Sequence, residues 1–357
     1  MFEETCKGII QALAGAPYDA VLLTSPQNRF YATGFRSSAG VALISARRAV
    51  FATDFRYFED AGSKIKGFEL VMSTTERTYT DIINTFCREE GVETLAFEAD
   101  AMSYTQYCAY AEKLAAKLVP EDGLLARLRH CKRGFELDRI EAAQRIAEGA
   151  FAKILERIKP GVRECDIAAE LDYQMRLGGA TGCSFDTIVV SGENGSLCHG
   201  VPGERVIQNG DFVTMDFGAL WGGYCSDMTR TVAVGHVSDE QRKVYDTVLR
   251  AQEAGIAAAH AGIIGADLHQ VAADIIAEAG YGAYFGHSLG HSLGIDVHDG
   301  PGAQPTNPNP LPEGVVVTIE PGIYIPGKFG VRIEDFVVLT PDGCRNFTRA
   351  PKELIIL

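Results

Sequence analysis

The sequence lacks a long apolar segment. Among its 357 residues, no stretch approaches the roughly 18–20 consecutive apolar residues that a membrane-spanning helix needs. The segment Met1–Ile10 carries acids where a signal peptide carries bases, and no apolar core follows it. We therefore expect a cytoplasmic protein that is not inserted in a membrane.

The sequence is also poor in bases relative to acids. It has 33 Lys and Arg against 47 Asp and Glu, which gives a formal net charge of −14. Nucleic-acid binding needs a basic face, so we expect no nucleic-acid partner. The nine cysteines form no Cys-x-x-Cys pair, which argues against a zinc ribbon and a disulfide framework. We expect reduced, mostly buried thiols.

The length of the chain predicts two domains, because single hydrophobic cores stop growing at about 250–300 residues. The boundary is expected between about Pro120 and Glu136, where the loop-like segment Val119–Gly123 precedes a long periodic helix. We therefore assign residues 1–128 to a small N-terminal domain and residues 129–357 to a larger C-terminal domain.

The hydrophobic patterns differ between the two parts. The first part alternates strand-like and helix-like segments, which is typical of α/β domains. The second is richer in glycine and predicts an α+β domain, with helices packed on a strongly bent, mostly antiparallel sheet. The predicted strands are Val41–Ile44, Ala49–Thr53, Thr187–Ser191, Phe212–Gly218, Tyr224–Val234, Val315–Glu320 and Val331–Leu339, and the predicted helices are Tyr104–Leu118, Glu136–Ile158, a helix after Asp166, Ser238–His260 and Ala266–Ala279.

Two aspartates lie within otherwise apolar strand patterns of the second domain. If the turn between the strands centres on Trp221-Gly222, Asp216 lies directly opposite Asp227. Their Cβ atoms would then be about 4.5–5.5 Å apart. Carboxylates that close repel each other unless they are protonated or bridged by a cation. The alternative is an off-centre turn that leaves each aspartate solvated.

Histidines and glutamates add to this pattern further along the chain. His287, His291 and His298 are three of only eight histidines, and they fall within twelve residues of a glycine-rich stretch. Glu320 ends one apolar run and Glu334 lies inside another. Singly, each glutamate has an ordinary explanation, such as capping a turn or pairing with an arginine. Together, four acids and one histidine have the composition of a binuclear metal site.

The residue types narrow the metal and its chemistry. Four carboxylates and one imidazole, without a thiolate, suit Mn(II), Co(II), Fe(II) or Zn(II). We expect two divalent ions, with Mn(II) as the first choice and the others as alternatives. Two metals sharing a water generate a hydroxide near neutral pH and polarise the carbonyl that it attacks. The sequence therefore predicts hydrolysis of an amide.

In order and spacing, these residues resemble the pita-bread metallopeptidases, which include aminopeptidase P, prolidase and methionine aminopeptidase. The resemblance implies a creatinase-like N-terminal domain followed by a pita-bread catalytic domain. Asn28–Phe35 is similar to the small domain of the proline-directed branch. The motifs that carry the resemblance are Asp216, Asp227 eleven residues later, His287-Ser-Leu-Gly-His291, Glu320-Pro-Gly and Arg332-Ile-Glu334.

The resemblance also implies a role for each motif residue. Asp216 would chelate one metal, Asp227 and Glu334 would bridge both, and His291 and Glu320 would bind the other. Glu320 would in addition move the proton of the bridging hydroxide.

Further residues are implied to contact the substrate. His199 would fix the substrate and His298 would hold the scissile carbonyl. His287 and Arg332 would line the proline side of the pocket, with Tyr324 in support.

By resemblance, the expected reaction is hydrolysis of the Xaa-Pro bond, at the N-terminus of peptides or in dipeptides, by a metal-bridged hydroxide. We expect proline-containing peptides as substrates and a homodimer. Two alternatives stay open: methionine aminopeptidase activity, and a metal-free creatinase-like enzyme or peptide-binding module on the same fold. Cys225 shares the predicted face of Asp227 and is expected near the metals.

Overall fold

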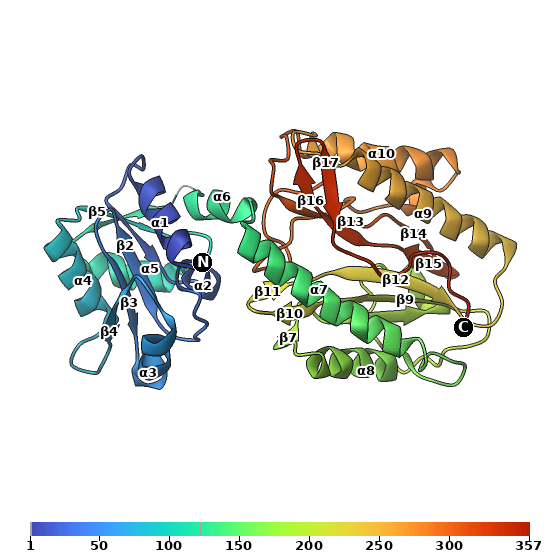
Figure 1. Ribbon diagram of the computed structural model, residues 1–357, viewed down its shortest axis with the longest axis horizontal. Helices are drawn as coiled ribbons and strands as arrows, with labels where there is room; N and C mark the ends of the chain where they lie inside the picture. The colour runs from blue at the N-terminus through green and yellow to red at the C-terminus, as the bar shows by residue number, and fades with distance from the viewer. Residues whose placement is uncertain (1, 122) are drawn as a thin grey trace. The chain divides into compact units, whose positions relative to one another are not determined.

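A six-stranded sheet organises the N-terminal unit, Met1–Arg129 (Figure 1). The computed structural model describes residues 2–121 and 123–357. The strand order is β4-β3-β2-β1-β5-β6; β2 pairs antiparallel with β1 and β3, and the other pairs are parallel. The central strands are buried along their whole length, so helices cover both faces. The strands are β1 (Ala20–Leu23), β2 (Val41–Ser45), β3 (Ala49–Thr53), β4 (Glu69–Met72), β5 (Thr94–Phe97) and β6 (Lys117–Pro120), and the helices are α1 (Phe2–Leu13), α2 (Pro26–Thr33), α3 (Phe55–Lys64), α4 (Tyr79–Glu90), α5 (Tyr104–Lys113) and α6 (Leu124–His130).

The predicted helix Tyr104–Leu118 is too long. Helix α5 ends at Lys113, and the chain then forms the edge strand β6, which includes part of the predicted loop. The side chain of Asn84, from α4, stops the helix: its Nδ2 donates to the Lys113 carbonyl (3.0 Å) and its Oδ1 accepts from the Ala115 N–H (2.9 Å). A residue about thirty positions earlier therefore decides where this helix ends.

The Asn28–Phe35 motif builds the inside of the N-terminal unit. The amide of Asn28 donates to the buried carboxylate of Glu98 (2.7 Å). Arg29, only 2% exposed, donates to the hydroxyl and carbonyl oxygens of Ser37 (3.0 Å each). These contacts hold α2 against the loops around it, so the motif has a structural role in this unit.

In the C-terminal unit, His130–Leu357, antiparallel strands lie between two pairs of helices (Figure 1). Helices α7 and α8 pack on β8, β9 and β12 through one hydrophobic cluster. Helices α9 and α10 pack on β13 to β16 through a second cluster. The helices are α7 (Gly134–Ile154), α8 (Glu164–Leu177), α9 (Asp239–Ala258) and α10 (Gly265–Glu278), with short 3-10 turns η1 (Gly192–Ser196) and η2 (Gly282–Tyr284), and the strands are β7 (Gly182–Cys183), β8 (Ile188–Ser191), β9 (Phe212–Phe217), β10 (Ala219–Trp221), β11 (Tyr224–Cys225), β12 (Met228–Ala233), β13 (Val316–Ile319), β14 (Gly322–Ile325), β15 (Phe329–Arg332), β16 (Asp335–Thr340) and β17 (Gly343–Asn346).

The helices of this unit begin close to their predicted starts. The capping box predicted before α9 is present, because the Ser238 hydroxyl accepts from the Gln241 N–H and the Gln241 side chain accepts from the Ser238 N–H. Helix α7 ends at Ile154, four residues before the predicted end. Within the described residues, no helix combines the length and the apolar character that a membrane crossing needs.

The predicted register of the aspartate hairpin is wrong. Asp216 pairs with Thr229 and not with Asp227, because the turn lies at Gly222-Gly223. Both glycines have positive φ (56° and 88°). A two-residue hairpin turn needs such angles, and Trp221 is ill suited to them. Asp227 lies two residues before Thr229, so by strand alternation it keeps the face of Asp216 as a diagonal neighbour.

The strand predicted at Val331–Leu339 is interrupted. Strand β15 ends at Arg332 and pairs with β14, whereas β16 begins at Asp335 and pairs with β13. Glu334 lies in the break, where its N–H donates to the Thr229 carbonyl (3.1 Å).

Candidate metal centre

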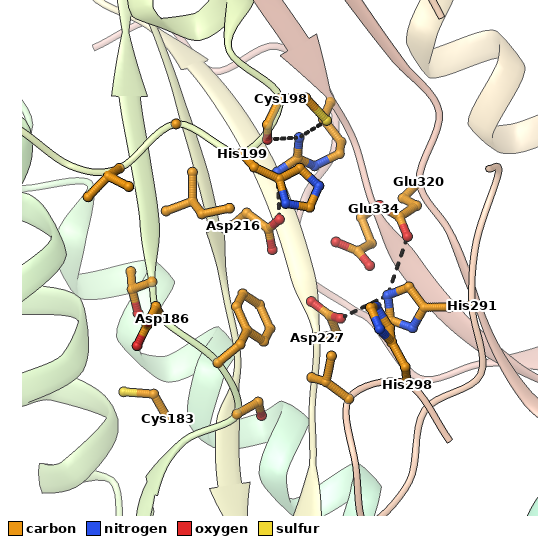
Figure 2. Close-up of a pocket in the computed structure, with 18 of the residues that line it drawn as sticks. Cys183, Asp186, Cys198, His199, Asp216, Asp227, His291, His298, Glu320 and Glu334 are labelled. Atoms are coloured by element: carbon orange, nitrogen blue, oxygen red, sulfur yellow. Dashed lines mark hydrogen bonds and ion pairs between the residues drawn. The ribbon is translucent and has the colours of Figure 1, made fainter. Parts of the chain in front are cut away.

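One cavity in the C-terminal unit is lined by all five predicted metal ligands. Its volume is about 1420 Å³. Figure 2 shows the carboxylates of Asp216, Asp227 and Glu334 pointing into one space, with His291 and Glu320 at its side. The structure thus brings together residues that are as far as 118 positions apart in the sequence.

Breaks between strands position three of the carboxylates. Asp227 lies between β11 and β12, Glu320 follows the last residue of β13, and Glu334 lies between β15 and β16. At these points, the backbone leaves one pair of hydrogen-bonded strands before it enters another. All three residues line the cavity.

Asp227, His291 and Glu334 form a group of possible ligands whose ligand atoms all lie within 4.8 Å of one another. Nε2 of His291 is 3.5 Å from Oδ2 of Asp227 and 3.4 Å from Oε1 of Glu320. Nδ1 of the same ring lies 3.2 Å from the carbonyl oxygen of Ser292, which favours the tautomer with the proton on Nδ1. The lone pair of Nε2 then faces the carboxylates, as a metal ligand requires.

Two cage carboxylates have one oxygen bonded to the protein and one without a hydrogen-bond partner. Oδ2 of Asp216 accepts from Nη2 of Arg332 (2.5 Å), and Oε2 of Glu334 accepts from the Thr229 hydroxyl (2.7 Å). Oδ1 of Asp216 and Oε1 of Glu334 are buried without a partner. An unpaired buried carboxylate oxygen is strongly unfavourable, so this arrangement fits divalent cations as the missing partners.

The charges in the cavity support the same interpretation. Burial, followed by the charge of Glu334, raises the pKa of Asp227 well above its usual range, and burial with the charge of Glu320 does the same to the pKa of Glu334. Burial raises the pKa of Glu320 to about 7. Burial lowers the pKa of His291, which keeps its ring neutral. Cations would offset the repulsion among these acids and hold them ionised.

The residues predicted to contact the substrate fall into two groups. His298 lies beside His291, with ring centroids 4.2 Å apart, and His199 is exposed on a loop at the same cavity (Figure 2). His287, Tyr324 and Arg332 form a chain: the Tyr324 hydroxyl is 3.0 Å from Nε2 of His287 and accepts from Nη1 of Arg332 (2.8 Å).

Because Arg332 also donates to Asp216, the chain of hydrogen bonds through His287, Tyr324 and Arg332 joins the predicted substrate residues to the predicted cage. Burial lowers the pKa of His287 to about 4, so its ring is neutral near pH 7. The sequence analysis expects Cys225 near the metals. Its thiol is buried and lies 3.5 Å from the carbonyl oxygen of Ile295.

The sequence analysis missed two threonines that support the cage. The Thr229 hydroxyl donates to Glu334. The Thr318 hydroxyl donates to Oε1 of Glu320 (3.0 Å) and accepts from the His291 N–H (3.0 Å). Strand alternation would have found both, because each threonine lies two residues from an acidic candidate and so shares its face.

Comparison with known proteins identifies the family. Residues 138–341 match the model of metallopeptidase family M24, and residues 6–131 match the creatinase/prolidase N-terminal domain. The chain belongs to metallopeptidase family M24. The expected order of a creatinase-like domain and a pita-bread metallopeptidase domain is confirmed. The expectation of a metal-dependent peptidase is also confirmed. Membership of family M24 implies divalent metals.

Several M24 relatives are similar over nearly their whole length. The uncharacterized peptidase YqhT of Bacillus subtilis is 46% identical over 342 residues, which cover 95% of this chain and 96% of the relative. The Xaa-Pro dipeptidase of Pyrococcus furiosus is 35% identical, and the match covers 99% of this chain and 100% of the relative. The structure of the Xaa-Pro dipeptidase from Bacillus anthracis has a TM-score of 0.96 at 44% identity, covering 100% of both chains. That of X-Pro aminopeptidase from Thermotoga maritima has a TM-score of 0.93 at 37% identity, covering 97% of this chain and 100% of the other.

Proposed function

We propose that this M24 protein is a two-metal peptidase that hydrolyses the bond between any residue and proline, at the N-terminus of peptides or in dipeptides. The observation that carries the proposal is the pair of unpartnered, buried oxygens on Asp216 and Glu334, which face the same space as His291. The relatives named as Xaa-Pro dipeptidases and X-Pro aminopeptidase support the choice of bond.

We propose Asp216, Asp227, His291, Glu320 and Glu334 as the metal ligands. Their oxygens and single imidazole suit Mn(II) first, with Co(II), Fe(II) or Zn(II) as alternatives. When bound, two such ions supply a hydroxide near neutral pH and polarise the scissile carbonyl.

The protein's own groups would then bind the substrate and move protons. Glu320, held by Thr318, takes up the proton of the attacking water and delivers it to the proline nitrogen as the bond breaks. His298 holds the scissile carbonyl and His199 fixes the substrate, and both line the cavity. His287 and Arg332, joined through Tyr324, form the wall for the proline ring.

The remaining parts of the proposal concern the whole chain. We propose residues 1–128 as the creatinase-like domain and residues 129–357 as the catalytic domain, in a cytoplasmic homodimer. The matches to both family models and to relatives across the whole chain support the division into two domains.

The experiment compares peptides that differ only in the residue after the bond. Purified protein with added Mn(II) is given Ala-Pro and Ala-Pro-Ala, with Ala-Ala and Ala-Ala-Ala as matched controls. We expect cleavage before proline only, and its loss after chelation with recovery on adding Mn(II). Full activity in chelator would contradict the metal site. Cleavage of Met-Ala peptides without any cleavage before proline would contradict the proline specificity.

A further inference from the structure

His199 lies on a loop that has little structure of its own. Segment 192–203 leaves β8, forms the short turn η1 and continues without a further helix or strand. The His199 side chain is exposed and lines the cavity, and within the described residues no hydrogen bond of its ring is found. The backbone of this segment must therefore determine where the ring lies.

One buried carboxylate holds both ends of that segment. Glu164, the first residue of α8, is 0% exposed. Its Oε1 accepts from the backbone N–H (2.6 Å) and hydroxyl (2.8 Å) of Ser191, just before the segment. Its Oε2 accepts from the Gly203 N–H (3.3 Å), at the far end. Asn194, in η1, donates to both oxygens (3.2 Å each).

This environment selects a carboxylate over an amide. All the groups that face Glu164 are donors, and an ionised carboxylate offers only acceptors. Within the described residues, no ion pair joins Glu164 to a base, although the guanidinium of Arg205 is close enough for its charge to interact with that of Glu164. Charge-assisted bonds of this kind are roughly twice as strong as neutral ones.

The middle of the segment is braced from the other side of the cavity. The carbonyl oxygen of Cys198, next to His199, accepts from Nη1 of Arg332 (3.1 Å). Gly195 packs against the backbone of Gly330, where an added Cβ atom would lie 3.0 Å from the Gly330 nitrogen. The segment is thus clamped between α8 and β15, with Glu164 at both of its ends.

We infer that Glu164 is a positioning residue for His199: it sets the loop so that the imidazole reaches the substrate in the cavity. The inference rests on the proposed function of His199. Glu164 does not line the cavity, so it acts through the loop and not by contact with substrate.

The test is a double-mutant cycle on Xaa-Pro hydrolysis. We expect Glu164→Gln to lower kcat/KM by about 10- to 100-fold, by analogy with the range seen when a partner that orients a metal-ligating side chain is lost. The matched control is Glu193→Gln, in η1. The Glu193 side chain is exposed and makes only a long ion pair with Arg205 (3.9 Å), so this variant should change kcat/KM by less than about twofold.

The cycle is completed with His199→Ala. If Glu164 acts through His199, the double variant is no slower than His199→Ala alone. Losses that multiply overturn the inference. Metal content should be unchanged in Glu164→Gln, because segment 192–203 carries none of the proposed ligands. If Glu164→Gln does not fold, Asn194→Ala removes two of the same hydrogen bonds and should show the same dependence on His199, with a smaller loss.

Hydrogen exchange separates this inference from the proposed function. A wild-type protein that cleaves no Xaa-Pro bond contradicts the proposed function, and amide exchange then decides the role of Glu164. We expect faster exchange across residues 192–203 in Glu164→Gln, with unchanged exchange in α9. Unchanged exchange across residues 192–203 overturns the inference.

Discussion

Glu320 makes the stability of the metal-free protein depend on pH. Its side chain is 16% exposed and shares the cavity with the carboxylates of Asp216, Asp227 and Glu334, and burial raises its pKa from 4.5 to about 7. Below pH 4.5, the group is protonated in both the folded and the unfolded state. Between pH 4.5 and 7, the unfolded chain loses this proton before the folded protein does. The stability that the raised pKa contributes is therefore fully present below pH 4.5 and lost as the pH rises through 7.

The size of the effect follows from the shift. A rise in the pKa of Glu320 from 4.5 to about 7 corresponds to about 3 kcal/mol, most of which is lost between pH 5 and pH 8. Glu320→Gln is neutral at every pH, and its amide oxygen can still accept from Thr318. We expect the metal-free variant to gain about 2–3 kcal/mol on the metal-free wild type over this pH range, because it also removes the Glu320 charge that acts on Asp227 and Glu334. For a unit of about 230 residues, this is a Tm gap that widens by about 5–10 °C.

The assay is calorimetry of both proteins in chelator at several pH values. Histidines with lowered pKa, such as His287 at about 4, titrate in both proteins and cancel in the comparison. Added Mn(II) should stabilise the wild type more at pH 8 than at pH 5, because the ions bind ionised carboxylates. A Tm gap that stays constant from pH 5 to pH 8 would refute the reasoning.

Three further substitutions test how the cage is built. Asp227→Ala should abolish activity and lower the metal stoichiometry measured by elemental analysis, because a proposed bridging ligand is lost; turnover within a few-fold of wild type would show that the cage is misassigned. Thr229→Val removes the hydroxyl that donates to a cage carboxylate and should weaken metal binding about 10- to 100-fold by titration, with an unchanged affinity counting against its orienting role. Gly290→Ala places a Cβ atom 1.8 Å from the Thr318 carbonyl oxygen and should cost about 1–3 kcal/mol in denaturant unfolding. Gly286→Ala, with no atom within 4 Å of the added Cβ, is its control, and equal losses in the two variants would contradict the packing argument.

The aspartate hairpin shows how far strand alternation carries a prediction. Alternation places Asp216 and Asp227 on one face whether the turn lies at Trp221-Gly222 or one residue later. It does not identify directly paired residues, because those depend on the turn. The Gly222-Gly223 pair is a known signal for a two-residue turn, so the correct register was available from the sequence.

The end of α5 could not be predicted from the sequence in this way. Residues 114–118 continue an apolar pattern that suits a helix. The helix stops because Asn84 binds its last turn and because Lys117–Pro120 completes the edge of the sheet beside β5. Both causes are tertiary contacts, which local patterns do not contain.

The partner of Arg332 shows the same limit inside the candidate site. Sequence spacing suggests Glu334, because residues two apart share a face in a continuous strand. The chain instead leaves β14 after Arg332 and joins β13 at Asp335. Arg332 therefore pairs with Asp216, 116 positions away, while Glu334 bonds Thr229 and keeps its other oxygen unpaired. Had the strand continued, the arginine would have neutralised Glu334 and removed one of the oxygens that face the proposed metals. The break between β15 and β16 thus leaves Oε1 of Glu334 unpaired and open to the proposed metals, and the order of motifs in the sequence points to the residue without revealing that reason.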